Sequence, residues 1–146
     1  MNRTRPSLTE KTAAIAYARA INTHETELLA PILHDELRVC DQRRWNPAVG
    51  GRRYIQMLEK YFRIVPPEKS VTTMELATLP RNPFAPAPPR PCVIEYHWGK
   101  LVCTVLFHVW AGKILQIEKR LIPSPTECEL TGIYPGLDFL PGENVN

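Results

Sequence analysis

The amino-acid sequence predicts an α+β fold, in which three N-terminal helices pack on a curved antiparallel sheet. The first reason is the placement of its 15 prolines, which gather between Pro80 and Pro91 and between Pro123 and Pro141. Proline is excluded from helix interiors and central strands, so the stretches that lack it are the regular elements. The second reason is the order of periodicities, because apolar residues recur at helical spacing in the first half and alternate in the second.

All 146 residues are expected to form one domain, because a single core typically serves a chain of about 100 to 200 residues. We expect the core to span residues 7–122 and the proline-rich tail, residues 123–146, to lack a regular element. Hydrophobic residues make up 44% of the chain and charged residues 23%, which excludes a disordered or a membrane-embedded protein. The formal net charge of +3 is too small to indicate a nucleic-acid partner.

The N-terminal residues Met1 to Pro6 contain basic side chains, and no apolar stretch follows them, so we expect no secretory signal. We therefore expect a cytoplasmic location. Four cysteines, Cys40, Cys92, Cys103 and Cys128, have no CxxC spacing and are too few for a disulfide scaffold. Free thiols are the expected state of all of them.

Helical periodicity predicts three helices in the first half of the chain. The segment Ser7 to Glu10 has the residue types of a capping box and opens a long first helix. A shorter second helix is expected over Glu25 to Leu33, where Pro31 either causes a kink or lies early enough to be tolerated. Gly50-Gly51 precede the third helix and Pro66-Pro67 end it. The apolar face of this third helix is formed by Tyr54, Ile55, Leu58, Tyr61, Phe62 and Val65.

The other elements are predicted to be strands. Leu37, Val39 and Asp41 share one face of a short strand, so a carboxylate ends an apolar stripe. Tight turns around Gly99 and Gly112 join later strands into an antiparallel meander. The four strands of the second half are expected over residues 71–79, 92–98, 102–110 and 114–122.

Alternation in the last two of these strands separates an inner from an outer face. The outer face combines Leu106, His108 and Trp110 with the charged Glu118 and Arg120, which is more apolar surface than a solvated sheet normally exposes. A homodimer formed through this outer sheet face is the first interpretation, and cover by the tail of the same chain is the alternative. The inner face is expected to hold Cys103, Val105, Phe107, Val109, Leu115, Ile117, Lys119 and Leu121.

Several segments, taken with this order of elements, resemble a known superfamily. They are Tyr17 to Glu25, Leu33 to Asp41, Gly51-Arg52 and Phe107 to Ile114, within a match from Thr9 to about residue 122. They resemble the nuclear transport factor 2-like superfamily, whose cone-shaped fold includes ketosteroid isomerase and polyketide cyclases of the SnoaL type. The resemblance implies a cone of three helices on a curved sheet. Because this fold hosts enzymes, ligand binders and interaction modules, it leaves the function open.

The resemblance also implies roles for individual residues. The ketosteroid isomerase pattern places an oxyanion hydrogen-bond donor at Tyr17 and a general-base aspartate at Asp41. The second oxyanion donor of that family, an acid on a strand, falls at about Val105, where a valine can donate nothing. Limonene epoxide hydrolase, another branch of the fold, uses an Asp-Arg-Asp set on its strands, and we find no such set in the strands of this sequence.

Each candidate residue also has a purely structural interpretation. A general base at Asp41 is set against pairing with Arg43 or Arg44, or capping of a turn. For Tyr17 the alternative is an ordinary packing aromatic. Lys119 interrupts an inner apolar stripe, so it holds an anionic ligand group, pairs with Asp41 or extends to solvent. The walls of a ligand pocket are expected from Trp45, Tyr61, Phe62, Met74, Tyr96, Trp98, Val105, Phe107, Ile117 and Lys119.

Motifs for metals and nucleotides are missing from the sequence: there is no HxxxH spacing, no GxSxG turn and no glycine-rich phosphate loop. We therefore expect no metal and no cofactor. The favoured function is a small-molecule pocket protein that carries out cofactor-free proton transfer, as an isomerase, cyclase or dehydratase, on an apolar carbonyl compound. The alternative is a non-catalytic ligand-binding or dimerisation module of the same fold. The expected partner is a small apolar ligand, with no nucleic acid and no membrane.

Overall fold

The computed structural model describes residues 8–44, 48–80 and 88–137. In these ranges the helices are α1 (Glu10–Thr23) and α2 (Gly51–Ile64). The strands are β1 (Leu33–Asp41), β2 (Ala48–Val49), β3 (Thr72–Leu79), β4 (Arg90–His97), β5 (Lys100–Trp110), β6 (Lys113–Arg120) and β7 (Glu129–Ile133). Short 3-10 turns occur at Thr26–Leu28, Ala30–Ile32, Pro67–Lys69 and Pro125–Glu127. The predicted α+β class is confirmed.

Helix α1 begins with a capping box, as the sequence indicates, but the cap is Thr9. Its hydroxyl accepts from the backbone N–H of Thr12 at 3.1 Å, and the Thr12 hydroxyl accepts from the backbone N–H of Thr9 at 2.9 Å. Both contacts satisfy donors that the first turn of a helix leaves free. The buried side of α1 is rich in small residues, which lets the helix lie close to the sheet: Ala13, Ala14, Tyr17, Ala18, Ala20, Ile21 and Asn22.

The second predicted helix, over residues 25–33, is present as two successive 3-10 turns, after which β1 begins at Leu33. Pro31 lies inside the second of these turns. Proline offers no amide donor and disfavours the α conformation of the residue before it, so a continuous α-helix cannot form across this position. The strand predicted to begin at Leu37 consequently starts four residues earlier.

The start of α2 depends on two adjacent glycines. Gly50, the N-cap residue, has a φ angle of +95°, which residues other than glycine rarely adopt. At Gly51, a Cβ atom would lie 2.5 Å from the carbonyl oxygen of His34 on β1, so only glycine allows the helix to approach the strand this closely. The glycines therefore fix how α2 packs against β1.

The strands form one sheet in the order β2-β1-β6-β5-β4-β3-β7. Neighbours from β3 to β6 pair antiparallel, which confirms the predicted meander, while β1 pairs parallel to β6 and makes the sheet mixed. The register between β5 and β6 shifts after His108, so Ile114 is buried in the core and Leu115 is only half-buried. In β5 the predicted alternation of inner and outer residues holds up to this shift, and in β6 it holds at Ile117.

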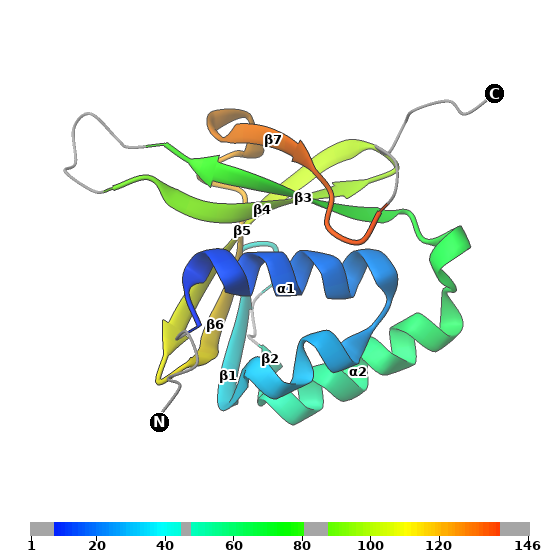
Figure 1. The fold of residues 1–146 in the computed structure, drawn as a ribbon. Helices are drawn as coiled ribbons and strands as arrows, with labels where there is room; N and C mark the ends of the chain where they lie inside the picture. The colour runs from blue at the N-terminus through cyan, green and yellow to red at the C-terminus, as the bar shows by residue number, and fades with distance from the viewer. Residues whose placement is uncertain (1–7, 45–47, 81–87, 138–146) are drawn as a thin grey trace, which may run out of the picture.

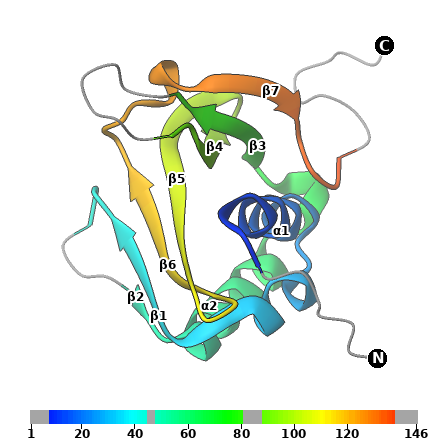
Figure 2. The same ribbon diagram turned by 60° about the vertical axis from the view of Figure 1, so that its left-hand side comes forward.

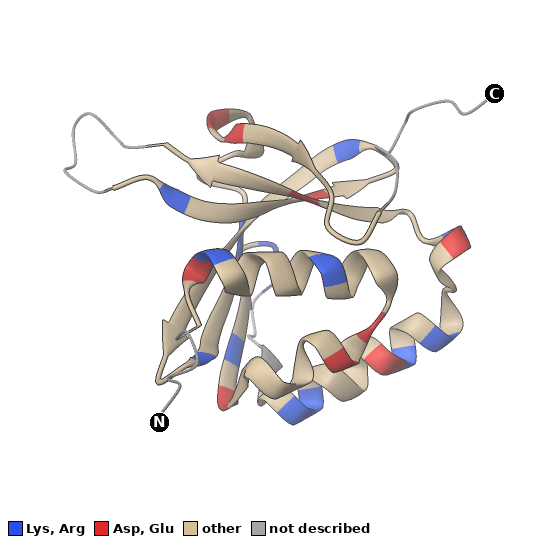
Figure 3. Ribbon diagram, viewed as in Figure 1, with Lys and Arg blue, Asp and Glu red and all other residues tan. Residues whose placement is uncertain are grey.

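Both helices lie on the same side of the sheet (Figure 1). Figure 2 shows the sheet bending around α1, so that the helix lies in its concave side. The main core lies between α1, α2 and this inner face and includes Leu37, Val93, Val105, Phe107 and Ile117, all of them fully buried. Figure 3 shows basic and acidic positions mixed along α2. None of the helices in the described ranges is long and apolar enough to cross a membrane.

Part of the tail, in which no element was expected, is ordered by the sheet. Strand β7 pairs with β3, for example at Ala77 with Leu130. Asn22 of α1 then holds the following residues, because its side-chain amide donates to the carbonyl groups of Met74 and Pro135, both at 2.9 Å. The Asn22 side-chain oxygen also accepts from the backbone N–H of Met74 at 2.8 Å. A single buried side chain thus connects the helix, the sheet and the tail.

Candidate functional site

A buried ion pair crosses the inner face of the sheet. Glu95 on β4 has a side chain only 3% exposed, and its Oε1 lies 3.1 Å from Nζ of Lys119 on β6. Register explains their meeting, since Glu95 pairs with Cys103 and Lys119 pairs with Val105 on the strand between them. Burial alone would lower the pKa of Lys119, but the neighbouring Tyr54 and Glu95 outweigh it and raise the pKa.

Two buried tyrosines from the helices lie beside this pair. Tyr17 of α1 is fully buried and packs edge-on against Phe107, with ring centroids 5.2 Å apart. Burial is the main cause that raises its pKa, followed by the charges of Tyr54 and Glu95. The Tyr17 hydroxyl has no hydrogen bond of acceptable geometry within the described residues, although the Tyr54 hydroxyl is close enough to affect its titration. The neighbouring Tyr54 hydroxyl is therefore a weak partner of this buried donor.

Cys103 completes the buried part of the cluster. Its thiol is fully buried on the inner face of β5, and burial, with a further contribution from Glu95, raises its pKa to about 12. The thiol therefore stays protonated at neutral pH and is a poor nucleophile. Its place beside Glu95 makes it part of the wall of the site.

Asp41, at the end of β1, is bound by Arg43. Asp41 Oδ1 accepts from the backbone N–H and from Nε of Arg43, each at 2.9 Å, and Oδ2 accepts from Nη2 at 2.8 Å. Burial would raise the pKa of Asp41, but these contacts and the charge of Lys119 outweigh burial and lower it. From the sequence, Asp41 was either a general base or a structural partner of Arg43 or Arg44. The structure contains the pairing with Arg43.

Arg43 also approaches Glu95, with Nη2 3.9 Å from Oε2. His97 binds the same oxygen more closely, with its Nε2 2.9 Å away. The side chains of Arg43 and His97 are 34% and 38% exposed, so the buried pair lies next to solvent on this side. An acid, an arginine and a second acid therefore meet here, and the sequence search missed this set because Arg43 lies after the end of β1.

Of the other predicted pocket residues, Met74, Val105, Phe107 and Ile117 lie in the inner core with Tyr17. Phe62 packs against the edge of this core, whereas Tyr61 and Trp98 lie outside it. Tyr61 and Phe62 pack against His24 at the end of α1, the latter stacked with ring centroids 4.3 Å apart. Trp98 is 77% exposed in the turn before β5. Trp45 lies outside the described residues.

Tyr96 lies on the outer face, in a second buried polar group. Its hydroxyl donates to Glu75 Oε1, which also accepts from the Tyr134 hydroxyl at 3.2 Å. Glu75 Oε2 accepts from the backbone N–H of Gly132 in β7 at 2.7 Å. Leu106 is buried nearby, in a cluster that Cys128 and Tyr134 pack against. The tail thus covers part of the outer face, while His108 and Trp110 stay exposed.

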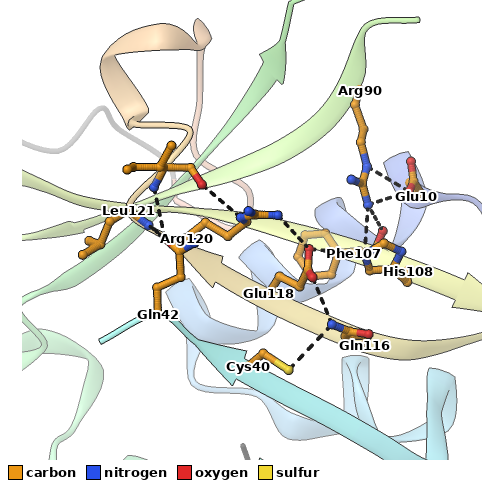
Figure 4. Close-up of polar contacts among 11 residues, drawn as sticks. Glu10, Cys40, Gln42, Arg90, Phe107, His108, Gln116, Glu118, Arg120 and Leu121 are labelled. Atoms are coloured by element: carbon orange, nitrogen blue, oxygen red, sulfur yellow. Dashed lines mark hydrogen bonds and ion pairs between the residues drawn. The ribbon is translucent and has the colours of Figure 1, made fainter. Parts of the chain in front are cut away.

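A cleft of about 330 Å³ opens between β1 and β6. Hydrogen bonds on the outer face border it, including Gln116 to Cys40 and Arg120 to the carbonyl oxygen of Ile122, as Figure 4 shows. The lining residues are Arg38, Cys40, Asp41, Gln42, Arg44, Glu118, Lys119 and Arg120. Within the described ranges, no group of His, Cys, Asp or Glu side chains is arranged to hold a metal ion.

Comparison with solved structures identifies the fold. An NTF2-like protein of unknown function from Cytophaga hutchinsonii superposes with a TM-score of 0.54 at 15% identity, covering 82% of this chain and 97% of the other. A SnoaL-like protein of unknown function from Burkholderia thailandensis gives 0.53 at 13% identity, covering 77% and 98%. The chain has the NTF2-like fold. An LEH-like epoxide hydrolase from M. tuberculosis also shares it, with a TM-score of 0.51 at 16% identity, covering 80% of this chain and 81% of the other.

At these identities the NTF2-like fold is shown and the chemistry is left open. No family model matches the sequence, and no curated protein matches it. The side chains on the inner face must therefore decide the function. Sequence reasoning found Tyr17, Asp41 and Lys119 there but missed Glu95, which the alternation of β4 could have placed on the inner face beside Val93.

Proposed function

We propose that this chain is a cofactor-free acid–base enzyme that acts on a small carbonyl compound at the inner-face cluster. In this proposal Tyr17 donates a hydrogen bond to the carbonyl oxygen, and Glu95 accepts a proton from the neighbouring carbon. The supporting observation is a buried hydroxyl with only a weak contact to Tyr54 among the described residues, in the same cluster as a buried carboxylate. The proposal keeps the expected reaction class, cofactor-free proton transfer, and replaces Asp41 by Glu95 as the base.

The Tyr17 hydroxyl, which among the described residues has only a weak contact to Tyr54, supports the role of hydrogen-bond donor. Leaving a buried polar group unsatisfied costs about 1 to 3 kcal/mol, so such groups call for an explanation. A ligand oxygen would supply the missing acceptor, and its negative charge would grow in the transition state of enolisation. A donor held in place before the reaction stabilises that charge most effectively.

Glu95 is a better candidate for the base than Asp41. Both oxygens of Asp41 accept from Arg43, and its pKa is lowered, which weakens it as a proton acceptor. Glu95 Oε1 lies 3.1 Å from the Lys119 ammonium, which engages one of the two lone pairs of this oxygen. This oxygen therefore keeps a lone pair available for a substrate proton. Asp41 then serves to hold Arg43 over the cluster.

One observation favours a second candidate, epoxide hydration. Arg43 Nη2 lies 2.8 Å from Asp41 and 3.9 Å from Glu95, an acid-arginine-acid arrangement like the set used by limonene epoxide hydrolase. Glu95 would take a proton from the attacking water while Tyr17 protonates the epoxide oxygen as its C–O bond breaks. The deciding difference between the candidates is whether oxygen from water enters the product.

A substrate panel in labelled solvent tests both candidates. Cyclic ketones and enones in D₂O would be followed by NMR for deuterium at the α carbon, and cyclic epoxides in H₂¹⁸O by mass spectrometry for labelled diols. We expect α-carbon exchange with the wild type and at least a tenfold slower rate with Tyr17→Phe. Labelled diol without ketone exchange would favour the second candidate. Binding of panel members without any turnover would support the non-catalytic ligand-binding module.

A further inference from the structure

Two cysteines face each other where the tail meets the sheet. Cys92, only 1% exposed on β4, has its Sγ 4.0 Å from Sγ of Cys128, the residue just before β7. The chain before β7 explains the approach, because Cys128 packs on the outer-face cluster that contains Cys92 and lies 3.8 Å from the Thr104 hydroxyl on β5. These thiols come together although 36 positions separate them in the chain.

We propose that Cys92 and Cys128 form a reversible intramolecular disulfide when the protein meets a peroxide, and that the bond fastens the tail to the sheet. A disulfide needs a sulfur separation of about 2 Å, so the two sulfurs must approach by roughly a further 2 Å. Their side chains already point at each other, and rotation about the Cα–Cβ bonds moves both sulfurs. The fold therefore presents the pair close to bonding geometry.

Cys128 is suited to react first. It is half-buried, whereas Cys92 is fully buried, so a small oxidant reaches Cys128 more easily. The hydrogen bond that Cys92 donates outweighs burial and lowers the pKa of Cys128, and a contact with the Thr104 hydroxyl at 3.8 Å acts in the same direction. Hydrogen bonding to Cys128 and burial raise the pKa of Cys92. A lowered thiol pKa and partial exposure are the conditions that favour attack on peroxide.

The reaction balances with hydrogen peroxide as the oxidant. The Cys128 thiolate attacks one peroxide oxygen, an S–O bond forms, the O–O bond breaks and hydroxide leaves. Cys92 sulfur then attacks Cys128 sulfur, the S–S bond forms and the S–O bond breaks, and the thiol proton of Cys92 ends in water. Two thiols are oxidised and one peroxide is reduced to two waters, which agrees with known cysteine chemistry.

The other two cysteines serve as internal controls. Cys40 is half-buried and accepts from the side-chain amide of Gln116 at 3.6 Å, and Cys103 is buried on the inner face. Neither has a hydrogen bond to a second sulfur within the described part of the chain, which contains all the cysteines. Peroxide should therefore crosslink Cys92 to Cys128 and leave Cys40 and Cys103 out of the crosslink.

Peptide mapping of the full-length chain tests the proposal. Reduced protein would be treated with a few equivalents of hydrogen peroxide, alkylated under denaturing conditions, digested and analysed by mass spectrometry. We expect two thiols to be lost, a crosslinked peptide pair containing Cys92 and Cys128, and full reversal by dithiothreitol. Cys40→Ser should give the same crosslink. Cys92→Ala should slow the oxidation of Cys128, because the activating hydrogen bond is lost, and the oxidised fraction should be a sulfenic acid that dimedone traps.

Other outcomes would overturn the proposal. They are oxidation of Cys128 to sulfinic acid in the wild type without a crosslink, or a crosslink that uses Cys40 or Cys103 or joins two chains. The wild-type map decides the question even if a variant fails to fold. As a second readout, amide hydrogen exchange across residues 129–133 should slow at least tenfold on oxidation and recover on reduction. Unchanged exchange in the crosslinked protein would contradict the fastening of the tail.

Discussion

Nζ of Lys119 and Oε1 of Glu95 lie 3.1 Å apart across β5, on the side of the sheet that the helices cover. The strand between them contributes the buried Cys103 and Val105; the Glu95 side chain is buried, and that of Lys119 is mostly buried. Removing one partner from such a pair leaves the other charge without a counterion. This lowers the free energy of unfolding by more than the intact pair contributes to it. Substitutions at Lys119 and Glu95 therefore test whether the two side chains stabilise each other.

Lys119→Met and Glu95→Gln should each lower the free energy of unfolding, by about 3 kcal/mol, because each leaves a buried charge or amide without its partner. The double variant should lose clearly less than the sum of the two. Urea denaturation of the four proteins measures this coupling. Glu118→Gln, on the outer face of the same strand, is the matched control and should change stability by less than 1 kcal/mol. Additive losses would show that the two side chains do not interact.

Asp41→Asn should reveal a pH-dependent contribution to stability. The pKa of Asp41 is lowered in the folded chain, so its contribution is complete above the unfolded value of about 3.9 and disappears as the pH falls through the lower folded value. The gap in urea midpoint between wild type and Asp41→Asn should be largest at pH 5 to 7 and shrink towards pH 2. Asp35→Asn, at an exposed position on the same strand, should show a smaller gap. A gap that widens in acid would contradict the Arg43 pairing.

The fold was largely predictable because it depends on local signals. Prolines mark the ends of the elements, and alternation placed Val105, Phe107 and Ile117 on the inner face, where they are fully buried. The signals failed where contacts distant in sequence decide. Nothing near Asn22 indicates that its side chain would pair with Met74 and so help to hold the tail.

The candidate site was predictable only in part for a related reason. Tyr17, Asp41 and Lys119 were found because each breaks an apolar pattern or matches a family position. Glu95 was missed because its role depends on register across three strands, which places it diagonally across β5 from Lys119. The alternation of β4 also places Tyr96 on the outer face, where its hydroxyl binds Glu75. Register and sheet curvature are long-range properties that one sequence does not specify directly.

Tyr134→Phe should loosen the tail without unfolding the protein. The change removes the hydroxyl that lies 3.2 Å from Glu75 Oε1, a hydrogen bond to a charged group worth about 1.5 kcal/mol. Amide hydrogen exchange across residues 129–133 should speed up about tenfold while protection in α1 is unchanged. Tyr61→Phe removes a half-exposed hydroxyl away from the tail and should leave β7 unaffected. Equal acceleration in α1 would mean that the whole fold had been weakened instead.

We propose that the exposed part of the outer face forms a two-fold homodimer centred on Trp110, which is 65% exposed beside His108. Light scattering should report about twice the chain mass of 16.7 kDa. Trp110→Glu should shift the protein towards monomer, because it buries a charge in an apolar contact. Trp98→Glu, which changes another exposed tryptophan, in the turn before β5, is the matched control. A wild-type monomer at micromolar concentration would rule out this interface.

Glu75→Gln provides the control for the central claim, because Glu75 is also a buried carboxylate, but on the outer face. The claim is that Glu95, and not Asp41, accepts the substrate proton. A ketone or enone that exchanges with the wild type would be compared across Glu95→Gln, Asp41→Asn and Glu75→Gln. Thermal unfolding and ligand binding would be measured alongside, so that loss of structure is not mistaken for loss of a base.

The most direct test is the rate of α-proton exchange in folded Glu95→Gln protein, measured by NMR in D₂O. The proposal predicts a fall of at least a hundredfold, the lower end of what a general base contributes, with ligand binding retained. Asp41→Asn should keep a rate within about tenfold of the wild type, and Glu75→Gln should exchange at the wild-type rate. A folded Glu95→Gln protein that exchanges as fast as the wild type, with the activity lost in Asp41→Asn, would contradict the assignment of the base.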